Sequence, residues 1–290
     1  MAEFELIDAD EAETPGDEFE EIDVSDTEAD RIARRRDREF AEFRERIKDA
    51  DQFKLEESVF DEATYGALYK LVQDGYVAAF GGPLSTGKEA NVYEALGGEA
   101  AGDVLEAERP TVAVKVYRIN TSSFRDMRDY LEGDPRFEGI GNEKSEVVKA
   151  WVRKEYSNLG RAREAGVRVP IPLAVERNVL IMEYIGTETG RAKRLNEVEI
   201  ENPETAYEVV REYMRRLYAA GLIHGDLSEY NVVFHEGQLV VIDLGQAVTV
   251  HHPNADDFLE RDCENVAAFF RRQGVETTAE DLEAFVRDED

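Results

Sequence analysis

The sequence predicts an α+β fold of two lobes: a small N-terminal lobe with a β-sheet and one key helix, and a reduced, helical C-terminal lobe. After residue 76 apolar residues mostly alternate with a period of two, as in strands, and after about 186 most recur with helical spacing. The 290 residues, 42% of them hydrophobic, suffice for a sizeable core. Strands followed by helices are typical of the α+β class.

Each element follows from its own pattern of apolar residues and turn signals. The first lobe is expected to contain a helix at 57–77 capped by Ser58 or Asp61, strands at 76–81, 90–96 and 111–118, a helix at 143–165 and a strand at 178–185. The second lobe is expected to contain a helix at 203–220, a hairpin at 231–243 and two helices within 254–290.

The N-terminal region differs from the rest of the chain in its charge. Residues 1–30 hold 14 acids and no Lys or Arg, which predicts a disordered acidic tail. Residues 31–48 carry eight cations and four acids, so we expect a charged helical or linker segment at 31–54 that pairs with the tail or contacts RNA or protein. The folded domain is expected at 55–275, with lobes at about 55–183 and 186–275, and a C-terminal helix with an acidic end at 276–290.

The composition is strongly acidic. The chain has 65 Asp and Glu against 35 Lys and Arg, a formal charge of −30. Since phosphate contacts need clustered cations, this charge argues against an ordinary nucleic-acid-binding surface and against sequence-specific DNA binding. We interpret it as adaptation to concentrated salt, as in proteins of salt-loving organisms; a mesophilic acidic interaction protein is the alternative.

Three absences in the sequence indicate where the protein acts. The single Cys263 excludes an internal disulfide, and the N-terminus lacks the basic and apolar regions of a signal peptide. No apolar run approaches the ~18 residues of a membrane span. We therefore expect a soluble, intracellular protein of the cytoplasm without a membrane partner.

The glycine-rich turn GGPLSTGKEANVY at 81–93 is a candidate phosphate-binding element. Gly82, Gly87 and Lys88 match the P-loop pattern, but Glu89 cannot supply the hydroxyl that binds magnesium there. A strand also follows where a P-loop needs a helix. A strand–turn–strand flap over phosphates explains the pattern better, with an ordinary hairpin as the alternative.

Two charged residues lie where apolar ones are expected. Lys115 is in the middle of the clearest strand, and Glu155 lies on the apolar stripe of the helix at 143–165. A buried lysine needs an anion and a buried carboxylate needs a cation, so we expect the two to pair and to hold nucleotide phosphates. The alternative is a lysine that extends into water from an edge strand.

The strongest motif is HGDLSEYN at 224–231, followed by Asp243 in VVIDLG. If Gly237 lies at the centre of the intervening turn, Asn231 and Asp243 lie opposite each other at the open end of a hairpin. Two such oxygen ligands suit Mg²⁺ that also binds substrate phosphates. Asp226 lies in the loop beside them and is placed to accept a hydroxyl proton or orient a nucleophile.

These motifs, together with HP…FL…DC…N…FF at 252–270, resemble the RIO kinases, atypical serine/threonine kinases, and most closely the type-1 subfamily. The resemblance covers roughly residues 55–275 and implies a two-lobed protein-kinase-like fold. It implies ATP and Mg²⁺, or Mn²⁺, as cofactors and the maturing small ribosomal subunit as partner, hence a role in ribosome biogenesis.

The resemblance also implies a role for each matching position. Asp226 would be the catalytic aspartate, Asn231 and Asp243 would bind the metal, and Asp243 would be a candidate phospho-aspartate nucleophile. The positions implied to bind nucleotide are Ser85, Thr86, Gly87 and Lys88 in the flap, the Lys115–Glu155 pair, Met182 behind the adenine, and the backbone of Glu183 and Ile185.

Several features depart from ordinary protein kinases. Only 47 residues follow Asp243, too few for an activation segment and a large helical substrate platform. An ATPase or self-phosphorylating switch is therefore as plausible as phosphorylation of another protein. Small-molecule phosphotransfer and nucleotide-dependent assembly without phosphate transfer are alternatives. The polar link at 119–145 resembles the family's flexible loop, in which Thr121, Ser122 and Ser123 are the candidate phosphorylation sites; a spacer without a role is the alternative.

Overall fold

The computed structural model divides into two units, Met1–Ala41 and Glu42–Asp290. The structure describes residues 38, 60–119, 124–131, 134–137, 139–141, 143–187 and 189–288, all but the first of which belong to the second unit. The expected acidic tail, nearly all of the segment at 31–54, Ser58, and the hydroxyl residues 121–123 lie outside the described residues.

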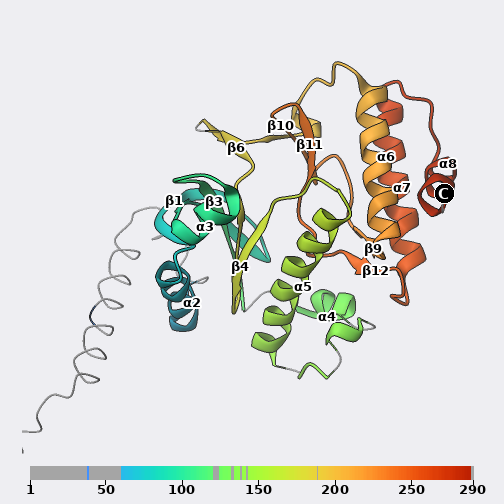
Figure 1. The fold of residues 1–290 in the computed structure, drawn as a ribbon. Helices are drawn as coiled ribbons and strands as arrows, with labels where there is room; N and C mark the ends of the chain where they lie inside the picture. Colours follow the sequence, from blue (N-terminus) through green and yellow to red (C-terminus); the bar gives the residue numbers. More distant parts are fainter. Residues whose placement is uncertain are drawn as a thin grey trace, which may run out of the picture. The chain divides into compact units, whose positions relative to one another are not determined.

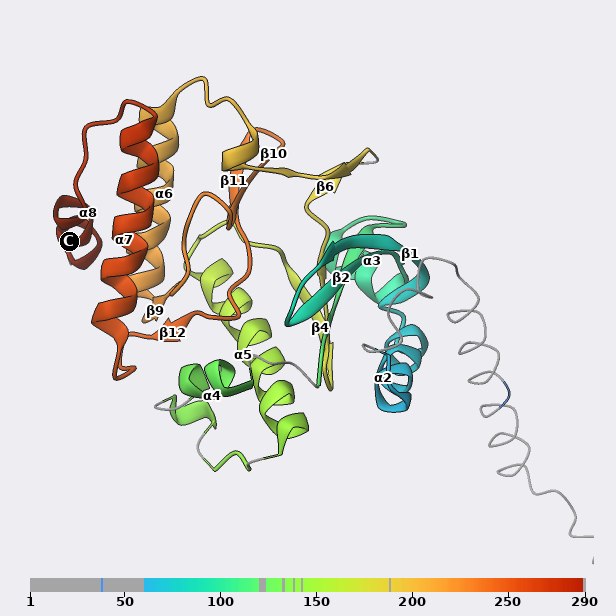
Figure 2. The ribbon, with the colours of Figure 1, turned by 180° about the vertical axis from the view of Figure 1, so that it is seen from behind.

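The N-terminal lobe contains a five-stranded antiparallel sheet (Figures 1 and 2). In spatial order its strands are β1 (Val77–Thr86), β2 (Ala90–Gly97), β3 (Thr111–Tyr117), β5 (Val179–Glu183) and β4 (Pro172–Glu176). The strand expected at 111–118 is therefore central and has neighbours on both sides, which explains why six of its seven residues are buried. Strand β4 and the short helix α3 (Glu99–Leu105) were not expected from the sequence.

Two predicted helices pack against this sheet. Helix α2 (Glu62–Gln73) begins at Asp61, whose carboxylate accepts a hydrogen bond from Thr64 N at 2.7 Å. Helix α5 (Lys144–Glu164) packs against β4 and β5. Its predicted stripe is buried throughout, including Glu155.

The link between β3 and α5 contains regular structure that the sequence did not predict. Helix α4 (Phe124–Leu131) packs beside α5 (Figure 2). The 3-10 turn η1 (Pro135–Phe137) contacts α5 through hydrogen bonds from Arg136 to Ser157 and Asn158. Tyr130 of α4 stacks on Phe258 at 5.0 Å and meets Trp151 edge-on at 5.8 Å. These aromatic contacts show that the described part of the link is packed against both lobes.

The C-terminal lobe is mainly helical, as expected. Helices α6 (Pro203–Ala219) and α7 (Ala255–Arg272) lie side by side, and α8 (Ala279–Arg287) packs against both (Figure 1). The remaining elements are short: β6 (Gly186–Thr187), β7 (Gly190–Arg191), β8 (Lys193–Arg194), η2 (Leu195–Glu197), β9 (Leu222–Ile223), β10 (Val232–His235), β11 (Gln238–Val241) and β12 (Val248–Thr249). Among the described residues no helix is long and apolar enough to cross a membrane.

The β10–β11 hairpin differs from the expected register by one residue. Val232 pairs with Val241 and His235 with Gln238, so the turn is the two residues Glu236 and Gly237, both with positive φ. Such a turn is typical of tight hairpins. Consequently Ile242 N donates to Asn231 O at 2.9 Å, and Asp243 lies one residue beyond this pair instead of opposite Asn231.

Replacing Asp61 with alanine is expected to lower the free energy of unfolding by about 1 kcal/mol, because the N-cap bond to α2 is lost. For a domain of this size the melting temperature should fall by about 2–4 °C, measured by thermal unfolding. Asp61→Asn keeps a capping side chain and serves as the control. An unchanged melting temperature for the alanine variant would show that the cap does not stabilise α2.

Candidate active site

A cavity of about 470 Å³ lies between the β1–β2 flap, the end of β5 with the segment that follows it, and the end of the β10–β11 hairpin. This volume is in the range of nucleotide and drug-sized ligands. Of the predicted site residues, its lining includes Ser85, Gly87, Lys88, Lys115, Glu155, Met182, Glu183, Ile185 and Asp243. Thr86, Asp226 and Asn231 are not among the lining residues.

Lys115 lies between two carboxylates from different lobes. Its Nζ donates to Glu155 Oε1 at 2.8 Å and to Asp243 Oδ1 at 2.9 Å. Strand β3 supplies the lysine, α5 supplies Glu155, and the segment after β11 supplies Asp243. The expected pairing of Lys115 with Glu155 is thus present, and Tyr117 OH also donates to the second oxygen of Glu155.

Burial and charge act in opposite directions on this cluster. Lys115 is 8% exposed; burial alone would lower its pKa, but the carboxylates of Asp243 and Glu155 outweigh this and raise it well above the usual value. The Lys115 ammonium lowers the pKa of Asp243, whose side chain keeps 55% of its surface open. Burial raises the pKa of Glu155 despite its bonds to Lys115 and Tyr117. The lysine therefore remains a cation facing the cavity.

The loop at 224–231 is bonded to helix α7. Asp262, which is buried, accepts hydrogen bonds from Gly225 N at 2.8 Å and Leu227 N at 2.7 Å, on either side of Asp226. Burial raises the pKa of Asp262 to about 6. Asn231 Nδ2 donates to Asp226 O at 2.8 Å and to its Oδ2 at 3.2 Å. These bonds fix the half-buried Asp226 carboxylate beside Asn231.

The strand end at Met182–Ile185 is fixed by an ion pair that the sequence did not predict. Arg168 forms two bonds with the Glu183 carboxylate, at 2.6 and 2.8 Å, and Glu183 Oε2 also accepts from Ile171 N. Glu183 N donates to Ile171 O at 2.9 Å, so the backbone nitrogen of Glu183 already has a partner. The carbonyl oxygen of Glu183 is therefore the candidate to accept a hydrogen bond from a bound base. The bonds to Arg168 fix the Glu183 side chain.

Asp243 has a backbone conformation that non-glycine residues rarely adopt. Its φ is +63°, in the left-handed region, where an L side chain costs about 1–2 kcal/mol. Such residues cluster at functional sites, where the surrounding structure holds them. Ile242, directly before it, is held through Asn231 O and the His224 ring.

The site offers few ligands of its own to a metal. Among the described residues no group of three or more His, Cys, Asp or Glu is placed to hold an ion. Asp243 and Asn231 supply hard oxygen atoms, and the Asn231 amide nitrogen is already bonded to Asp226. A donor set of this kind fits Mg²⁺ that completes its shell with phosphate oxygens and water.

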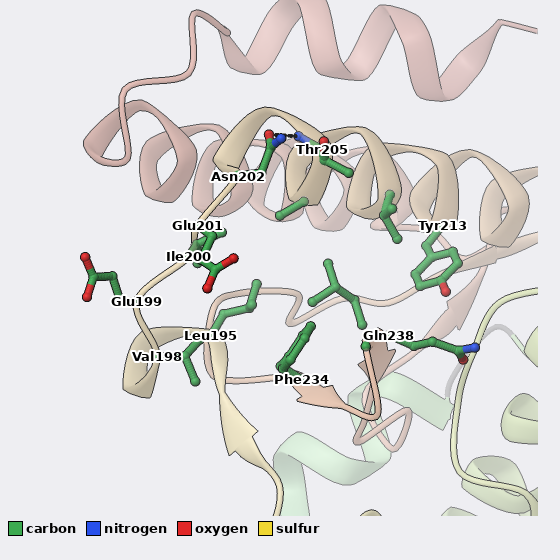
Figure 3. A pocket seen from close by; sticks show the side chains of 14 residues that line it. Leu195, Val198, Glu199, Ile200, Glu201, Asn202, Thr205, Tyr213, Phe234 and Gln238 are labelled. Carbon is green, nitrogen blue, oxygen red and sulfur yellow. Dashed lines mark hydrogen bonds between the residues drawn. The ribbon is translucent and has the colours of Figure 1, made fainter.

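A second cavity of similar volume lies in the C-terminal lobe (Figure 3). Its walls come from the segment between η2 and α6 and from the hairpin, with apolar residues such as Leu195, Val198 and Phe234. Its described lining holds two acids, Glu199 and Glu201, and no Lys or Arg. Because it lacks a cation for phosphates, the cavity around Lys115 is the candidate active site.

Three residues that shape this site were not predicted from the sequence as site residues. Arg168, Asp262 and Tyr117 each bond to a predicted site residue or its neighbours. Arg168 and Tyr117 had weak signals, because an arginine in a loop and a tyrosine in a strand are common. Asp262 belongs to the quoted motif at 252–270, but no role was predicted for it. Cys263 is buried, and burial raises its pKa to about 12.

Comparisons with known proteins identify relatives of the chain. The family model described as "RIO domain" matches residues 91–283. The chain is 68% identical over 284 residues to the RIO-type serine/threonine-protein kinase Rio1 of Haloferax volcanii, which covers 98% of this chain and 95% of that protein. It is 37% identical over 250 residues to the serine/threonine-protein kinase RIO1 of Homo sapiens, covering 84% of this chain but 42% of the human protein.

A solved structure shares the fold. The crystal structure of the Rio2 kinase-ADP/Mg²⁺-phosphoaspartate complex from Chaetomium thermophilum matches with a TM-score of 0.57 and 23% identity, over 77% of this chain and 66% of that one. At this identity the likeness concerns the fold alone. With the family model, the relatives and the fold in agreement, the chain belongs to the RIO-type serine/threonine-protein kinases and to their Rio1 branch.

Proposed function

We propose that the chain transfers the γ-phosphoryl group of ATP to a serine or threonine hydroxyl in a Mg²⁺-dependent reaction, and that it also phosphorylates itself and hydrolyses ATP. The observation that supports this most is Lys115, a buried cation shared by two carboxylates at the edge of a nucleotide-sized cavity. Glu155 alone would neutralise Lys115, so a purely structural ion pair would not need the second carboxylate, Asp243. The phosphates of a bound triphosphate would compete with Asp243 for this lysine.

The proposed roles follow the cavity from base to phosphates. Adenine would lie against Met182 and bond to the backbone of Glu183 and Ile185; the flap residues Ser85, Thr86, Gly87 and Lys88 would cover the phosphates that Lys115 binds and Glu155 orients. Asn231 and Asp243 would hold Mg²⁺, which supplies charge neutralisation on the phosphates when bound. Asp226 would orient the acceptor hydroxyl and take its proton.

Asp243 has a second proposed role, as nucleophile. An oxygen of its carboxylate would form a bond to the γ-phosphorus while the bond from that phosphorus to the ADP oxygen breaks, and water would then release phosphate. The fold relative solved as an ADP/Mg²⁺-phosphoaspartate complex supports this suggestion by analogy. This route gives net ATP hydrolysis and suits a switch.

The cellular role is proposed from family resemblance. We propose a cytoplasmic protein that acts on the maturing small ribosomal subunit, with ATP turnover timing its release. A nucleotide-dependent assembly factor that transfers no phosphate is the second candidate.

Incubation with γ-labelled ATP in high KCl, with and without small ribosomal subunits, separates these functions. Free phosphate, self-labelling and transfer to another protein are scored separately. Transfer identifies a kinase acting in trans, whereas phosphate release that depends on the subunit identifies a switch. Binding of ATP without any of the three products would contradict the proposed phosphotransfer.

Asp243→Asn is expected to lower Mg²⁺-dependent ATP hydrolysis and self-labelling at least 100-fold, because it removes the charged metal ligand and the nucleophile together. Asp257→Asn, on the exposed face of α7, is the control for loss of one surface charge. Full activity of Asp243→Asn would refute the metal and nucleophile assignments.

Lys115→Met is expected to abolish ATP turnover and to destabilise the protein by about 3 kcal/mol, because Glu155 is left buried without its cation. The double variant Lys115→Met/Glu155→Leu removes both charges and should recover most of the stability but no activity. Urea unfolding and ATP binding by calorimetry measure the two effects. Recovered turnover in the double variant would show that Lys115 has a structural role only.

A further inference from the structure

The segment that begins at Asp243 is held by side chains of α5. We define the metal loop as residues 243–247, which run past α5 between β11 and β12 (Figure 2). Asn158 Nδ2 donates to Leu244 O at 3.2 Å and to Ala247 O at 3.0 Å. Lys154 Nζ donates to Gly245 O at 2.9 Å. Both side chains are fully buried, so these bonds are shielded from water.

The orientation of the Asn158 amide is set from its other side. Arg136, in the turn η1, donates from Nη2 to Asn158 Oδ1 at 3.1 Å. Asp134 is 3% exposed and holds the same guanidinium at 2.6 Å. Although burial opposes it, the hydrogen bonds from Arg136 lower the pKa of Asp134, so the aspartate stays charged. With a cation at its oxygen, the amide must direct its nitrogen to the metal loop.

This arrangement explains how the left-handed Asp243 is maintained. Its conformation costs about 1–2 kcal/mol, which favourable contacts of the surrounding structure must offset. The two Asn158 bonds reach the carbonyl directly after Asp243 and the carbonyl at the end of the loop. In the proposed nucleotide complex the phosphates would compete with Asp243 for Lys115, whereas the two Asn158 bonds would stay in place.

We propose that Asn158 is a positioning residue that holds Asp243 in its metal-binding orientation through the Leu244 and Ala247 carbonyls, and that Arg136 fixes the amide that does so. The inference rests on the proposed function, in which Asp243 binds Mg²⁺. It also connects the link between α4 and α5 to the metal loop, because a movement of Arg136 would release the Asn158 amide.

The first test uses the protein without metal or nucleotide. In Asn158→Ala, amide hydrogen exchange in residues 244–247 should become about tenfold faster, while exchange in β3 and in β10–β11 stays unchanged. Ser157→Ala is the matched control, since Ser157 Oγ also contacts Arg136, at 3.1 Å, but does not touch the metal loop. Unchanged exchange at 244–247 in Asn158→Ala would overturn the proposal.

The second test measures metal and nucleotide binding separately. Asn158→Ala should raise the Mg²⁺ concentration for half-maximal ATP turnover about tenfold, as expected for a residue that orients a metal ligand. Its affinity for ATP in EDTA, measured by calorimetry, should stay within about twofold of the wild type, because no nucleotide contact is lost. Asn158→Asp has the same shape but cannot donate, so it should act in the same direction. A parallel loss of metal-free ATP affinity would indicate a general packing role and contradict the proposal.

A third variant keeps the proposal testable if Asn158→Ala does not fold. Arg136→Ala is combined with Asp134→Asn, so that no buried carboxylate loses its cation. This double variant leaves Asn158 in place and should raise the Mg²⁺ requirement in the same direction by a smaller factor, about twofold to fivefold. No shift in the double variant would refute the orienting role of Arg136. Failure of the proposed function is distinguishable from failure of this inference. If the proposed function is wrong, Asp243→Asn keeps its activity. If Asp243→Asn is inactive but the Asn158 variants behave like the wild type, only this inference is refuted.

Discussion

Lys115 is buried in the central strand of the N-terminal sheet, and its charge constrains the elements that surround it. A lysine at this position is stable only when carboxylates approach it, and they come from two other elements. For Glu155 to reach Lys115, α5 must pack with this charged position facing the sheet. For Asp243 to reach Lys115, the segment after the C-terminal hairpin must lie beside the lysine. The ion cluster therefore positions the parts of the cavity relative to one another.

Helix α5 carries a second constraint on the same site. One of its turns supplies Glu155 to the lysine, and the neighbouring Lys154 and Asn158 bond to the backbone that follows Asp243. A rotation or shift of α5 would therefore change the lysine and the metal loop together. Since η1 contacts Asn158 through Arg136, the link before α5 has a physical route to both.

Most of the site was predictable because its signals are local. Lys115 and Glu155 stood out as charges within apolar patterns, and the hydrogen bond between them confirms the pairing. The hairpin register was wrong by one residue, because the expectation centred the turn on Gly237 whereas Glu236 also adopts positive φ. The partners of Asn158 lie 86 and 89 residues away along the chain, and no local periodicity predicts such contacts. Helix α4 was missed because it is short and polar within a glycine-interrupted link.

The net charge of −30 is a property of the whole chain. Function is proposed to depend instead on the few charged residues that are buried or converge on the cavity. Lys115, Asn231 and Asp243 are proposed to belong to one nucleotide–metal site. A crystal structure of the chain with ADP and Mn²⁺ would test this site directly, because the anomalous signal of manganese locates the metal. We expect a single strong peak within coordination distance of the Asp243 carboxylate and the Asn231 amide oxygen, with ADP phosphates beside Lys115. Nucleotide or manganese bound elsewhere, with this cavity empty, would contradict the proposal.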